Sequence, residues 1–452
     1  MFLLLLWSPL SLFAQQDDWQ ELFNGTDFRG WQQRNGQAEY RVKDSTIIGI
    51  AKLNTPNSFL CTKEEFSDFI LEFDVKVDAG LNAGVQFRSQ SDPDYRKGRV
   101  YGYQVEIDPS QRAYSGGIYD EARRGWLYPL SQNPMGRQAF KNGRWNHIRV
   151  EAIGSQIRTY VNGINCANLV DEQDSRGFIG LQVHSIDSKE EKNRRVMWRN
   201  IRIKTSQLEE SRWSMHPKVP EFNYIPNSLT ASEKRRGWRL LWDGTSAQGW
   251  RAVQQPVFPQ KGWTMADGEL RTASTPAGKP IYAEDIMTEE TYGDFELIVD
   301  FKIGKGVDSG IEYFIDPALL AEQGDAVGLE FQILDDQHHA EAKRGVSGNR
   351  TLASLYDLIP AENLSTPNRS KVFRGIGQWN RAHIIVRGNR IEHWLNGFKT
   401  VEFERNTPMY RALVHHSKYN NFPKFGETAA GHILLQGCEG QLSFRNLKIR
   451  EF

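Results

Sequence analysis

The sequence contains the same pattern twice. Residues 68–77 (DFILEFDVKV) are matched by residues 294–303 (DFELIVDFKI). Three further correspondences join Trp145-Asn146 to Trp379-Asn380, residues 161–163 (VNG) to residues 395–397 (LNG), and residues 199–203 to residues 445–449. A repeat of roughly 220–250 residues is too long for a solenoid unit, so each copy should be a complete domain with its own core. Two copies of one scaffold can diverge, so that one keeps chemistry that the other loses.

Charge and composition exclude some classes of partner. The 452-residue chain has 56 basic and 56 acidic residues, so no global field attracts nucleic acid or an anionic membrane. The 39 glycines, together with Asn-Gly and Asp-Gly pairs, predict many turns and hence β structure. Aromatic residues make up 12%, which suits stacking on sugar faces. Composition leaves the oligomeric state open.

The N-terminus has the pattern of an export signal. Residues 2–13 are almost wholly apolar, and Ala14 is followed by Gln-Gln-Asp-Asp. Such a run is too short to span a bilayer but fits the apolar region of a signal peptide. We therefore expect a signal peptide over residues 1–14 and a periplasmic or secreted protein. The alternative is a buried N-terminal strand, and the absence of a cysteine directly after the run disfavours a lipid anchor.

Strand patterns dominate both copies. We expect domains over residues 18–204 and 237–452, joined by a linker over residues 205–236 in which residues 230–233 (TASE) have the spacing of a helix capping box. Residues 157–166 and 393–402 each read as a hairpin, because Asn-Gly supports the positive φ values of a type I′ turn. No long amphipathic helix pattern appears. The predicted fold is all-β, with two tandem antiparallel β-sandwiches of concanavalin-like jelly-roll type.

Alternation along the strands places polar side chains on one face of each copy. In the first copy these residues are Gln86 with Arg88, Gln104 with Glu106 and Asp108, and Gln182 with His184. In the second copy the counterparts are Glu312, Glu330, Gln332 and Gln436. One interpretation is the solvated face of an antiparallel sheet. The other is a ligand-binding face, since sugar hydroxyls need both donors and acceptors.

Two loops carry unusual mixtures of charged and aromatic residues. The first copy contributes Asp120, Glu121, Arg123, Arg124 and Trp126, which we expect to bind substrate together with Gln86, Gln104 and Gln182. The alternative is a set of ion pairs that only fix the loop. In the second copy, Asp335, Asp336, His338 and His339 lie close enough in sequence to ligate a divalent metal, although their spacing matches no defined motif.

The three cysteines leave two alternatives open. Cys61 and Cys166 lie in the same copy and would pair in an oxidising compartment, which would leave Cys438 unpaired. A thiol nucleophile is the other alternative.

With these residues in view, both copies resemble the 3-keto-disaccharide hydrolase family of bacterial sandwich domains, also described as 3-keto-glucoside 1,2-lyase/3-keto-2-hydroxy-glucal hydratase. The matching stretches of the first copy are residues 102–109 (GYQVEIDP), 115–124 (SGGIYDEARR) and 180–185 (GLQVHS). Those of the second copy are residues 309–313 (SGIEY), 330–336 (EFQILDD), 354–360 (SLYDLIP) and 394–397 (WLNG). The second copy departs from the family at Cys438, where a histidine is usual; the first copy keeps His184 there.

The resemblance implies cleavage of 3-keto-glucosides by removal of the C2 proton, β-elimination of the C1 oxygen and addition of water. Such a site needs a base, donors to the C3 oxygen and an acid for the leaving group. We expect His184 as base, Arg88 and Tyr119 as donors, and Glu106 or Asp108, raised in pKa by mutual proximity, as acid.

The second copy has its own candidates, and two other functions stay open. Its corresponding residues would be Asp335, His339, Lys343 and Tyr356, in a possible second site with Glu312, Glu330 and Gln332. The resemblance implies no organic cofactor and leaves a divalent metal open. The alternatives are a non-catalytic carbohydrate-binding protein and a conventional glycoside hydrolase that uses Glu106 with Asp120 or Glu121.

Overall fold

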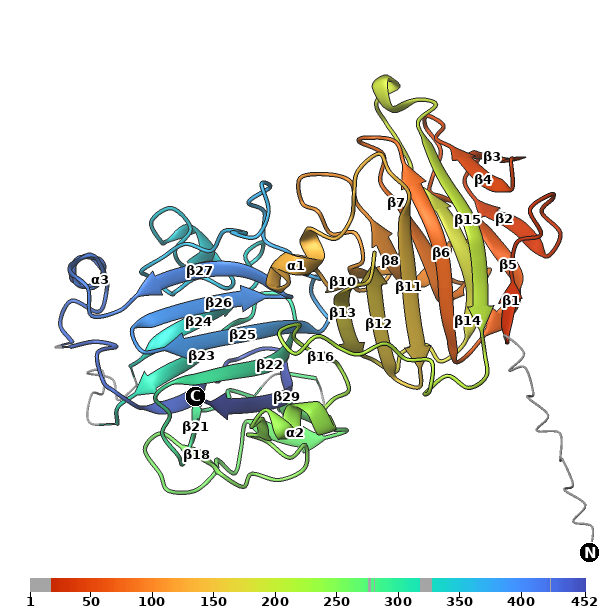
Figure 1. The fold of residues 1–452 in the computed structure, drawn as a ribbon. Coiled ribbons are helices and arrows are strands. Elements are labelled where there is room, and N and C mark those ends of the chain that lie inside the picture. The colour runs from red at the N-terminus through yellow and green to blue at the C-terminus, as the bar shows by residue number, and fades with distance from the viewer. Residues whose placement is uncertain (1–17, 275–277, 280, 318–326, 423) are drawn as a thin grey trace, which may run out of the picture.

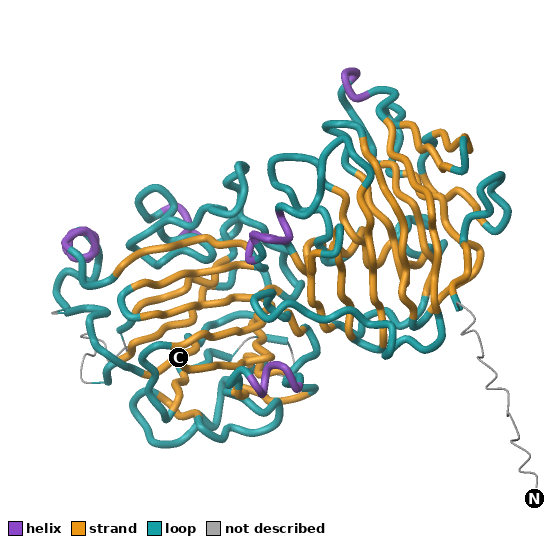
Figure 2. Tube along the Cα trace, viewed as in Figure 1, coloured by secondary structure: helices purple, strands orange, loops and turns teal. Residues whose placement is uncertain are grey.

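The computed structural model describes residues 18–274, 278–279, 281–317, 327–422 and 424–452. Strands dominate both halves (Figure 2), and the chain forms two tandem antiparallel β-sandwiches that lie side by side (Figure 1). The expected signal peptide, residues 1–14, lies outside the described residues. Within the described part of the chain, the helices are too short and too polar to cross a bilayer.

The first sandwich consists of two sheets. Its larger sheet has nine described strands in the order β16 (Phe222–Asn223), β13 (Ile164–Val170), β12 (Gln156–Val161), β11 (Asn146–Ile153), β6 (Phe69–Val77), β15 (Arg195–Lys204), β4 (Thr46–Ile50) and β3 (Glu39–Lys43), with β1 (Trp19–Glu21) paired to β15. Its smaller sheet has seven described strands in the order β10 (Gly125–Tyr128), β9 (Ile118–Glu121), β8 (Tyr101–Ile107), β7 (Ala83–Gln90), β14 (Gly177–Val183), β5 (Ser58–Phe66) and β2 (Trp31–Asn35).

The second sandwich also has two sheets. The larger, of eight described strands, has the order β19 (Trp263–Ala266), β20 (Glu269–Thr272), β29 (Leu442–Glu451), β22 (Phe295–Ile303), β25 (Asn380–Arg387), β26 (Arg390–Leu395) and β27 (Phe398–Glu404), with β17 (Arg239–Leu240) paired to β29. The smaller, of five described strands, has the order β18 (Trp250–Ala252), β21 (Ile286–Thr288), β28 (His432–Leu435), β23 (Asp308–Ile315) and β24 (Leu329–Leu334).

The sequence repeat is a repeat of topology. The order β13-β12-β11-β6-β15 of the first domain returns as β27-β26-β25-β22-β29, and β8-β7-β14-β5-β2 returns as β24-β23-β28-β21-β18. Both predicted hairpins are confirmed, and the turn residues Asn162, Gly163, Asn396 and Gly397 all have positive φ. Duplication therefore copied a whole sandwich, as the length of the repeat requires.

Alternation along the strands fills the core between the two sheets. The residues that alternate with the polar positions of the first domain are all buried: Val85, Phe87, Tyr103, Val105, Ile107, Leu181 and Val183. They pack with residues of the opposite sheet, including Phe73, Val75 and Ile148, in one cluster. Because the apolar residues face inward, the polar residues between them must face the other side of the seven-stranded sheet.

Short helices occupy the connections. They are α1 (Pro134–Arg137), α2 (Ala231–Arg235) and α3 (Pro408–His415), with 3₁₀ turns η1 (Leu130–Gln132), η2 (Lys189–Glu191) and η3 (Ala340–Lys343). The predicted capping box is confirmed: Thr230 accepts from the Glu233 amide, and Glu233 accepts from the Thr230 amide. Lys448 of β29 contacts Glu233, so this linker helix is tied to the second domain.

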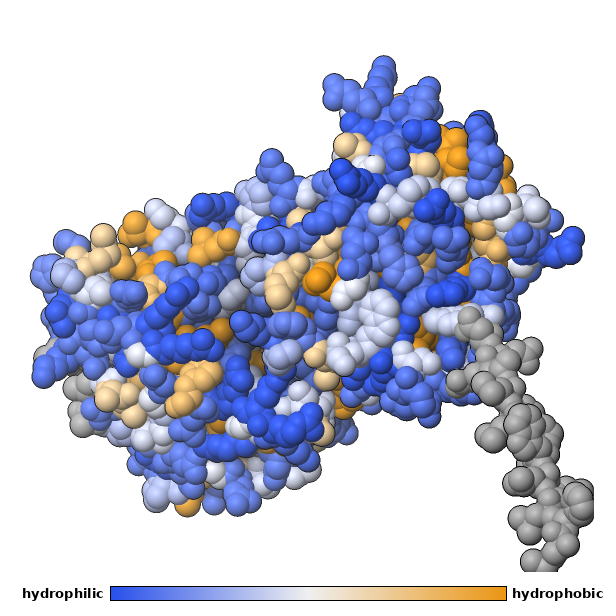
Figure 3. Space-filling model, viewed as in Figure 1, coloured by the Kyte–Doolittle hydropathy of each residue, from blue (hydrophilic) through white to orange (hydrophobic). Residues whose placement is uncertain are grey.

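The face shown in Figure 3 is mostly hydrophilic over both domains, with hydrophobic residues in separate small patches. No extended apolar docking face is visible among the described residues on this side.

Candidate functional site

A pocket of about 1110 Å³ lies on the polar face of the seven-stranded sheet. The predicted residues that line it come from β14, β8, β9, β10 and the loops that follow them: Gln104, Glu106, Tyr119, Glu121, Arg123, Arg124, Trp126, Gln182 and His184. The sequence therefore placed most of the face correctly. Gln86, Arg88, Asp108 and Asp120 lie outside the lining, each for its own reason.

A row of hydrogen-bonded amides and a carboxyl forms the floor of the pocket. Nε2 of Gln86 donates to Oε1 of Gln104 across 2.6 Å, and Nε2 of Gln104 donates to Oε2 of Glu106 across 2.9 Å. Asn82 Nδ2 donates to the other oxygen of Glu106 across 2.6 Å. Gly84 leaves room for this row, because a Cβ there would lie 2.6 Å from Nε2 of Gln104. Gln86 thus lies beneath the pocket and orients Gln104.

Glu106 has the properties of a proton donor. Burial raises the pKa of its carboxyl, and the bond from Asn82 and the charge of Arg112 offset this only in part. Asp108 behaves in the opposite way. Burial alone would raise the pKa of its carboxyl, but Arg112, whose Nε lies 2.7 Å from Oδ2, lowers it overall. The expectation that mutual proximity makes either residue an acid is therefore wrong for Asp108.

His184 follows β14 directly and lines the pocket with a half-buried ring. Its Nδ1 lies 2.7 Å from the carbonyl oxygen of Ser185. A carbonyl oxygen only accepts, so Nδ1 carries a proton, and Nε2 is the nitrogen that holds the lone pair in the tautomer this contact selects. The Ser185 amide is held in turn by Oδ1 of Asn57 across 2.9 Å, which fixes the loop that carries the histidine.

Gln182 presents a buried, unpaired side-chain amide to the pocket. Its side chain is 1% exposed and lines the pocket, yet neither amide atom has a hydrogen-bond partner among the described residues. An unpaired buried amide costs on the order of 1–3 kcal/mol per polar group. A polar ligand that bonds to both atoms would recover this cost.

Two aromatic rings form the wall beside Glu106. Tyr119 and Trp126 meet edge to face with ring centres 5.3 Å apart, and the Arg112 guanidinium lies over Trp126 at 5.2 Å. Burial raises the pKa of the Tyr119 phenol to about 12, so the hydroxyl remains a donor at neutral pH. The wall combines an apolar ring face with a fixed proton donor.

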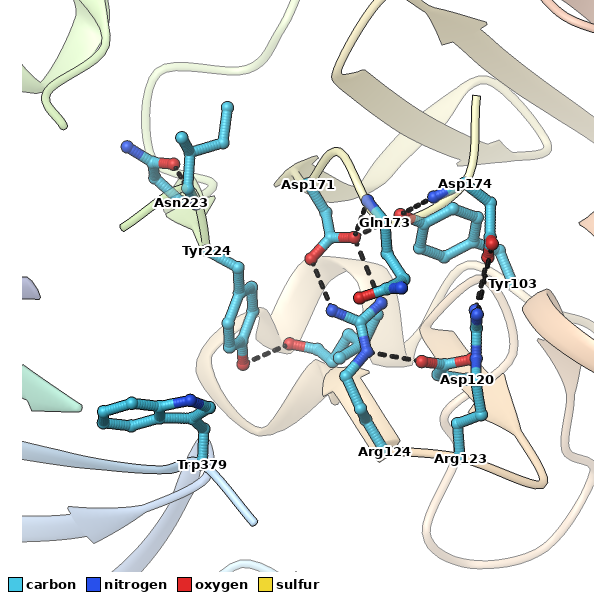
Figure 4. A network of polar contacts seen from close by, with 12 residues as sticks. Tyr103, Asp120, Arg123, Arg124, Asp171, Gln173, Asp174, Asn223, Tyr224 and Trp379 are labelled. Atoms are coloured by element: carbon cyan, nitrogen blue, oxygen red, sulfur yellow. Dashed lines mark hydrogen bonds and ion pairs between the residues drawn. The ribbon is translucent and has the colours of Figure 1, made fainter. Parts of the chain in front are cut away.

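The arginine loop beside this wall is an ion-pair network (Figure 4). Asp120 accepts from Nε of Arg123 across 2.9 Å and from Nε of Arg124 across 2.5 Å. Arg124 also binds Asp171, and Arg123 binds Asp174. Asp120 is fully buried behind the pocket with both oxygens used. The alternative that ion pairs only fix the loop is therefore correct for Asp120. Arg123 and Arg124, in contrast, also line the pocket.

Arg88 is the clearest error of the alternation argument. The pairing of β7 with β8 shifts register between Phe87 and Gln90, and Arg88 adopts a φ of 46°. This bulge turns its side chain away from Gln86. The guanidinium is buried and donates to Asp68 at 2.7 Å and to the carbonyl of Gly154 at 2.8 Å. Arg88 thus ties the seven-stranded sheet to the β11–β12 turn.

The corresponding face of the second domain carries carboxyl groups where the first domain carries amides. Glu312 lies opposite Glu330, as Gln86 lies opposite Gln104 in the first domain. Burial raises the pKa of Glu330 to about 8, and burial together with the charge of Glu330 raises the pKa of Glu312 well above its ordinary value.

The position equivalent to His184 differs as well. Gln436 bonds to Gly310, just as Gln182 pairs with Gly84, so Cys438 occupies the position of His184. Burial raises the pKa of the Cys438 thiol to about 12, which leaves it a poor base or nucleophile.

Other predicted residues of the second domain are held in contacts around this pair and in the loops. Tyr356 donates to Glu341 across 2.7 Å, Gln332 donates to Asp308 across 2.8 Å, and Lys343 is exposed on η3. The predicted residues of this copy therefore form a buried carboxyl pair, a group in which Gln332 and His339 both face Asp308, and a separate contact between Tyr356 and Glu341.

The metal hypothesis for this loop does not fit its geometry. Asp335 binds His338 Nδ1 at 2.8 Å, whereas His339 faces Asp308 at 3.5 Å. Asp336 binds Lys371 at 2.7 Å. Within the part of the chain that the structure describes, no group of three or more His, Cys, Asp or Glu side chains is arranged to hold a metal.

All three cysteines are free and buried. Cys61 and Cys166 lie in opposite sheets of the first domain and form no disulfide. Burial raises the pKa of the Cys166 thiol to about 12, and it raises that of Cys61 as well. The structure therefore favours neither the disulfide nor the thiol nucleophile.

The sequence analysis did not predict several residues that line the pocket. Asn57, Asn82, Arg99 and Arg112 lie on loops, where alternation has no predictive power. Arg99 could have been linked to the acidic loop, and its Nη2 lies 2.9 Å from Glu121. Residues 372–374 also line the pocket but belong to the second domain, so no pattern within the first copy could reveal them.

Comparison with known proteins identifies relatives of both halves. A family model described as the 3-keto-alpha-glucoside-1,2-lyase-like domain matches residues 18–204 and again residues 237–450. A 3-keto-disaccharide hydrolase from Bacteroides thetaiotaomicron is 30% identical over 244 residues, which cover 50% of this chain and 81% of that protein.

Solved structures show further likeness. A protein from Parabacteroides distasonis, provisionally titled a glycosyl hydrolase, is 25% identical with a TM-score of 0.43, over 50% of this chain and 99% of that one. The carbohydrate-binding module CBM66 from Bacillus subtilis is 18% identical with a TM-score of 0.27, over 41% of this chain and 99% of that one.

Proposed function

Because this chain belongs to the 3-keto-alpha-glucoside-1,2-lyase-like domain family, we propose that its first domain cleaves 3-keto-glucosides by elimination and hydration. The family and its relative support a hydrolase that acts on a carbohydrate. The observation that carries the finer proposal is the position of His184. Its Nε2 is free as a base in a pocket that also holds the buried carboxyl of Glu106.

The first step is removal of the C2 proton. The ketone at C3 acidifies this proton, and Nε2 of His184 takes it. The electrons of the C2–H bond move toward the C3 oxygen, where neutral donors stabilise the developing charge. Gln182 offers an unpaired amide on the histidine side, and Tyr119 offers a hydroxyl on the other. Arg88 has no part in this step, since its guanidinium lies elsewhere.

The second step breaks the C1–O bond. The enolate electrons form the C1–C2 double bond and re-form the C3 ketone, while the departing oxygen takes a proton from Glu106. Water then adds across the double bond, its hydroxyl to C1 and a proton from His184 to C2. The balance is hydrolysis of the glycosidic bond, with both side chains returned to their starting states after Glu106 regains the proton of the water.

The test compares a 3-keto-glucoside with its unoxidised parent. Elimination predicts an enone-type ultraviolet absorbance only with the keto sugar. Substitution His184→Gln should lower this rate by about 10²–10⁴-fold, whereas His216→Gln, an exposed linker histidine, is the matched control. Glucose release from the parent alone would instead indicate a conventional glycosidase. Binding without turnover of either sugar would indicate a carbohydrate-binding protein.

We also propose that the protein is exported to the periplasm or beyond. The support is the apolar run of residues 2–13 followed by a polar segment. Expression in a Gram-negative host, fractionation and mass measurement should give a protein shortened by about 14 residues outside the cytoplasm. Full-length protein confined to the cytoplasm would contradict export.

A further inference from the structure

We infer that the second domain forms part of the first domain's substrate site, with Phe373 contacting the leaving group. This inference rests on the proposed function and deepens it. The segment 372–374, here called the 372–374 wall, lines the pocket together with Trp126 and Tyr119 of the first domain. A domain that has lost the histidine of its own site would thus contribute to the site of its neighbour.

The 372–374 wall extends the pocket beyond the edge of the first domain's sheet. Strand β10 is the last strand of the seven-stranded sheet, and its Trp126 carbonyl accepts from Nη2 of Arg374 across 2.9 Å. Nη1 of the same guanidinium donates to the Trp379 carbonyl in its own domain across 3.2 Å. One arginine therefore bridges the two domains and closes the exposed strand edge.

The linker strengthens this bridge. Tyr224 lies between the arginine loop of the first domain and Trp379 of the second (Figure 4). Its hydroxyl donates to the Leu127 carbonyl across 3.0 Å, and the guanidinium of Arg381 lies over its ring at 4.1 Å. The linker thus contacts β10 and the second domain with one side chain.

A second contact fixes the orientation of the domains. Phe398 of β27 packs within the core cluster of the first domain, with its ring 6.3 Å from that of Tyr114. Beside it, Ser131 donates to the Gly397 carbonyl, and a Cβ at Gly397 would lie 2.9 Å from Cγ of Pro129. Because these contacts are close, they fix the position of the 372–374 wall over the pocket.

The equivalent segment of the first domain does not line the pocket. In the first domain the Lys141 amide donates to Oδ1 of Asn146, and in the second the Arg374 amide donates to Oδ1 of Asn380. Since Asn146 and Asn380 are equivalent in the repeat, the residues before the two amides, Phe140 and Phe373, are counterparts. Both phenylalanines pack partly buried against their own domain's core. The two positions are alike in fold and differ in access to the pocket, which makes Phe140 a matched control.

The order of the strands indicates which part of the substrate meets Phe373. The base His184 follows β14 and the acid Glu106 lies on β8, on the side of β9 and β10. The acid protonates the oxygen that leaves C1, so the leaving group extends from β8 toward β10 and the wall. The volume of about 1110 Å³ exceeds the roughly 300–1,000 Å³ of ordinary small-ligand pockets, which gives room for a second ring. The chemistry that fits an aromatic side chain here is a ring with an apolar face, either a second sugar or an aryl group.

The test measures kcat/KM for a 3-keto-disaccharide, an aryl 3-keto-glucoside and methyl 3-keto-glucoside. Substitution Phe373→Leu should lower the ratio of disaccharide to methyl glycoside by roughly three- to tenfold, and Phe373→Tyr should keep it. Phe140→Leu should leave the ratio at its wild-type value. A larger loss for the aryl glycoside than for the disaccharide would identify an aryl leaving group. An unchanged ratio in Phe373→Leu would overturn the inference.

Failure of the proposed function has a separate signature. If the wild-type protein turns over none of the keto sugars, binding of the unoxidised disaccharide is measured by calorimetry. Weaker binding in Phe373→Leu than in Phe140→Leu would support the wall although the reaction was wrong. Equal binding, or no binding by the wild-type protein, would overturn it. Should Phe373→Leu not fold, Gly397→Ala displaces the wall with Phe373 intact and is judged by the same ratio.

Discussion

Asn82 donates to Glu106 across 2.6 Å, and the second domain carries the reverse pair, in which Gln332 donates to Asp308 across 2.8 Å. The register of β7 with β8 and of β23 with β24 makes the two pairs equivalent. Amide and carboxyl have exchanged places while the hydrogen bond has been kept. Position for position, the first domain presents one buried carboxyl among amides, whereas the second presents a carboxyl pair.

The carboxyl pair makes a first prediction. Burial raises the pKa of Glu330 to about 8, so the folded state binds a proton that the unfolded chain releases above its ordinary pKa of 4.5. Stability should therefore fall as pH rises from about 4.5 to about 8. Glu330→Gln, which installs the residue found at Gln104, should reduce this slope to the part due to Glu312 and stabilise the second domain at pH 8 by on the order of 2 kcal/mol.

Thermal unfolding at pH 5, 7 and 8 checks this prediction. The expected result is a wild-type melting temperature that declines across the series and a flatter series for Glu330→Gln. Gln104→Glu, the reverse change in the first domain, should create a decline of the same sign. Parallel slopes in wild type and Glu330→Gln would show that this carboxyl does not govern the pH dependence.

The acid role proposed for Glu106 makes a second prediction. Glu106→Gln keeps the size and the bond from Asn82 but has no proton to give. The loss in kcat/KM should reach about 10²–10⁴-fold for an alkyl 3-keto-glucoside and be far smaller for a nitrophenyl one, whose oxygen leaves without a proton. Asp108→Asn, which changes a carboxyl outside the lining, is the control. Equal losses for both leaving groups would assign Glu106 a structural role.

Arg88 makes a third prediction, opposite to the one that alternation would make. Its guanidinium donates to Asp68 and to the carbonyls of Ser67, Ala152 and Gly154. Arg88→Met should cost about 2–3 kcal/mol of stability, because the buried carbonyl of Ala152 and two partly buried carbonyls lose their donor. KM and kcat at a temperature well below unfolding should stay within about twofold of wild type. A selective fall in kcat, with an unchanged melting temperature, would return Arg88 to the reacting centre.

Strand alternation predicted part of the candidate site and failed at one residue, for physical reasons that can be named. Alternation correctly placed Gln104, Glu106, Gln182 and His184 on one face, because a period of two is a local property of an extended backbone. It failed at Arg88, because a β-bulge that the local sequence does not predict turns the side chain to another side of the strand.

Longer-range features were invisible for a different reason. The charge balance around Asp108 depends on Arg112, a loop residue four positions on, and the 372–374 wall depends on how two domains dock. Alternation along a strand predicts which side of the sheet a residue lies on. It cannot predict which residues of another domain contact that side. The sequence alone matched His184 with Cys438, and the strand register confirms that match.

The domain contact makes the last prediction, and the repeat supplies its control. Gly163 and Gly397 occupy equivalent hairpin turns with φ of 82° and 83°, so alanine costs each turn about the same 1 kcal/mol of backbone strain. A Cβ at Gly163 would meet nothing within 4 Å, whereas one at Gly397 would press on Pro129. Gly397→Ala should therefore lower the melting temperature further than Gly163→Ala, expose the linker to limited proteolysis and raise KM for a 3-keto-disaccharide. Equal effects of the two substitutions on all three measurements would show that the domains do not depend on this contact.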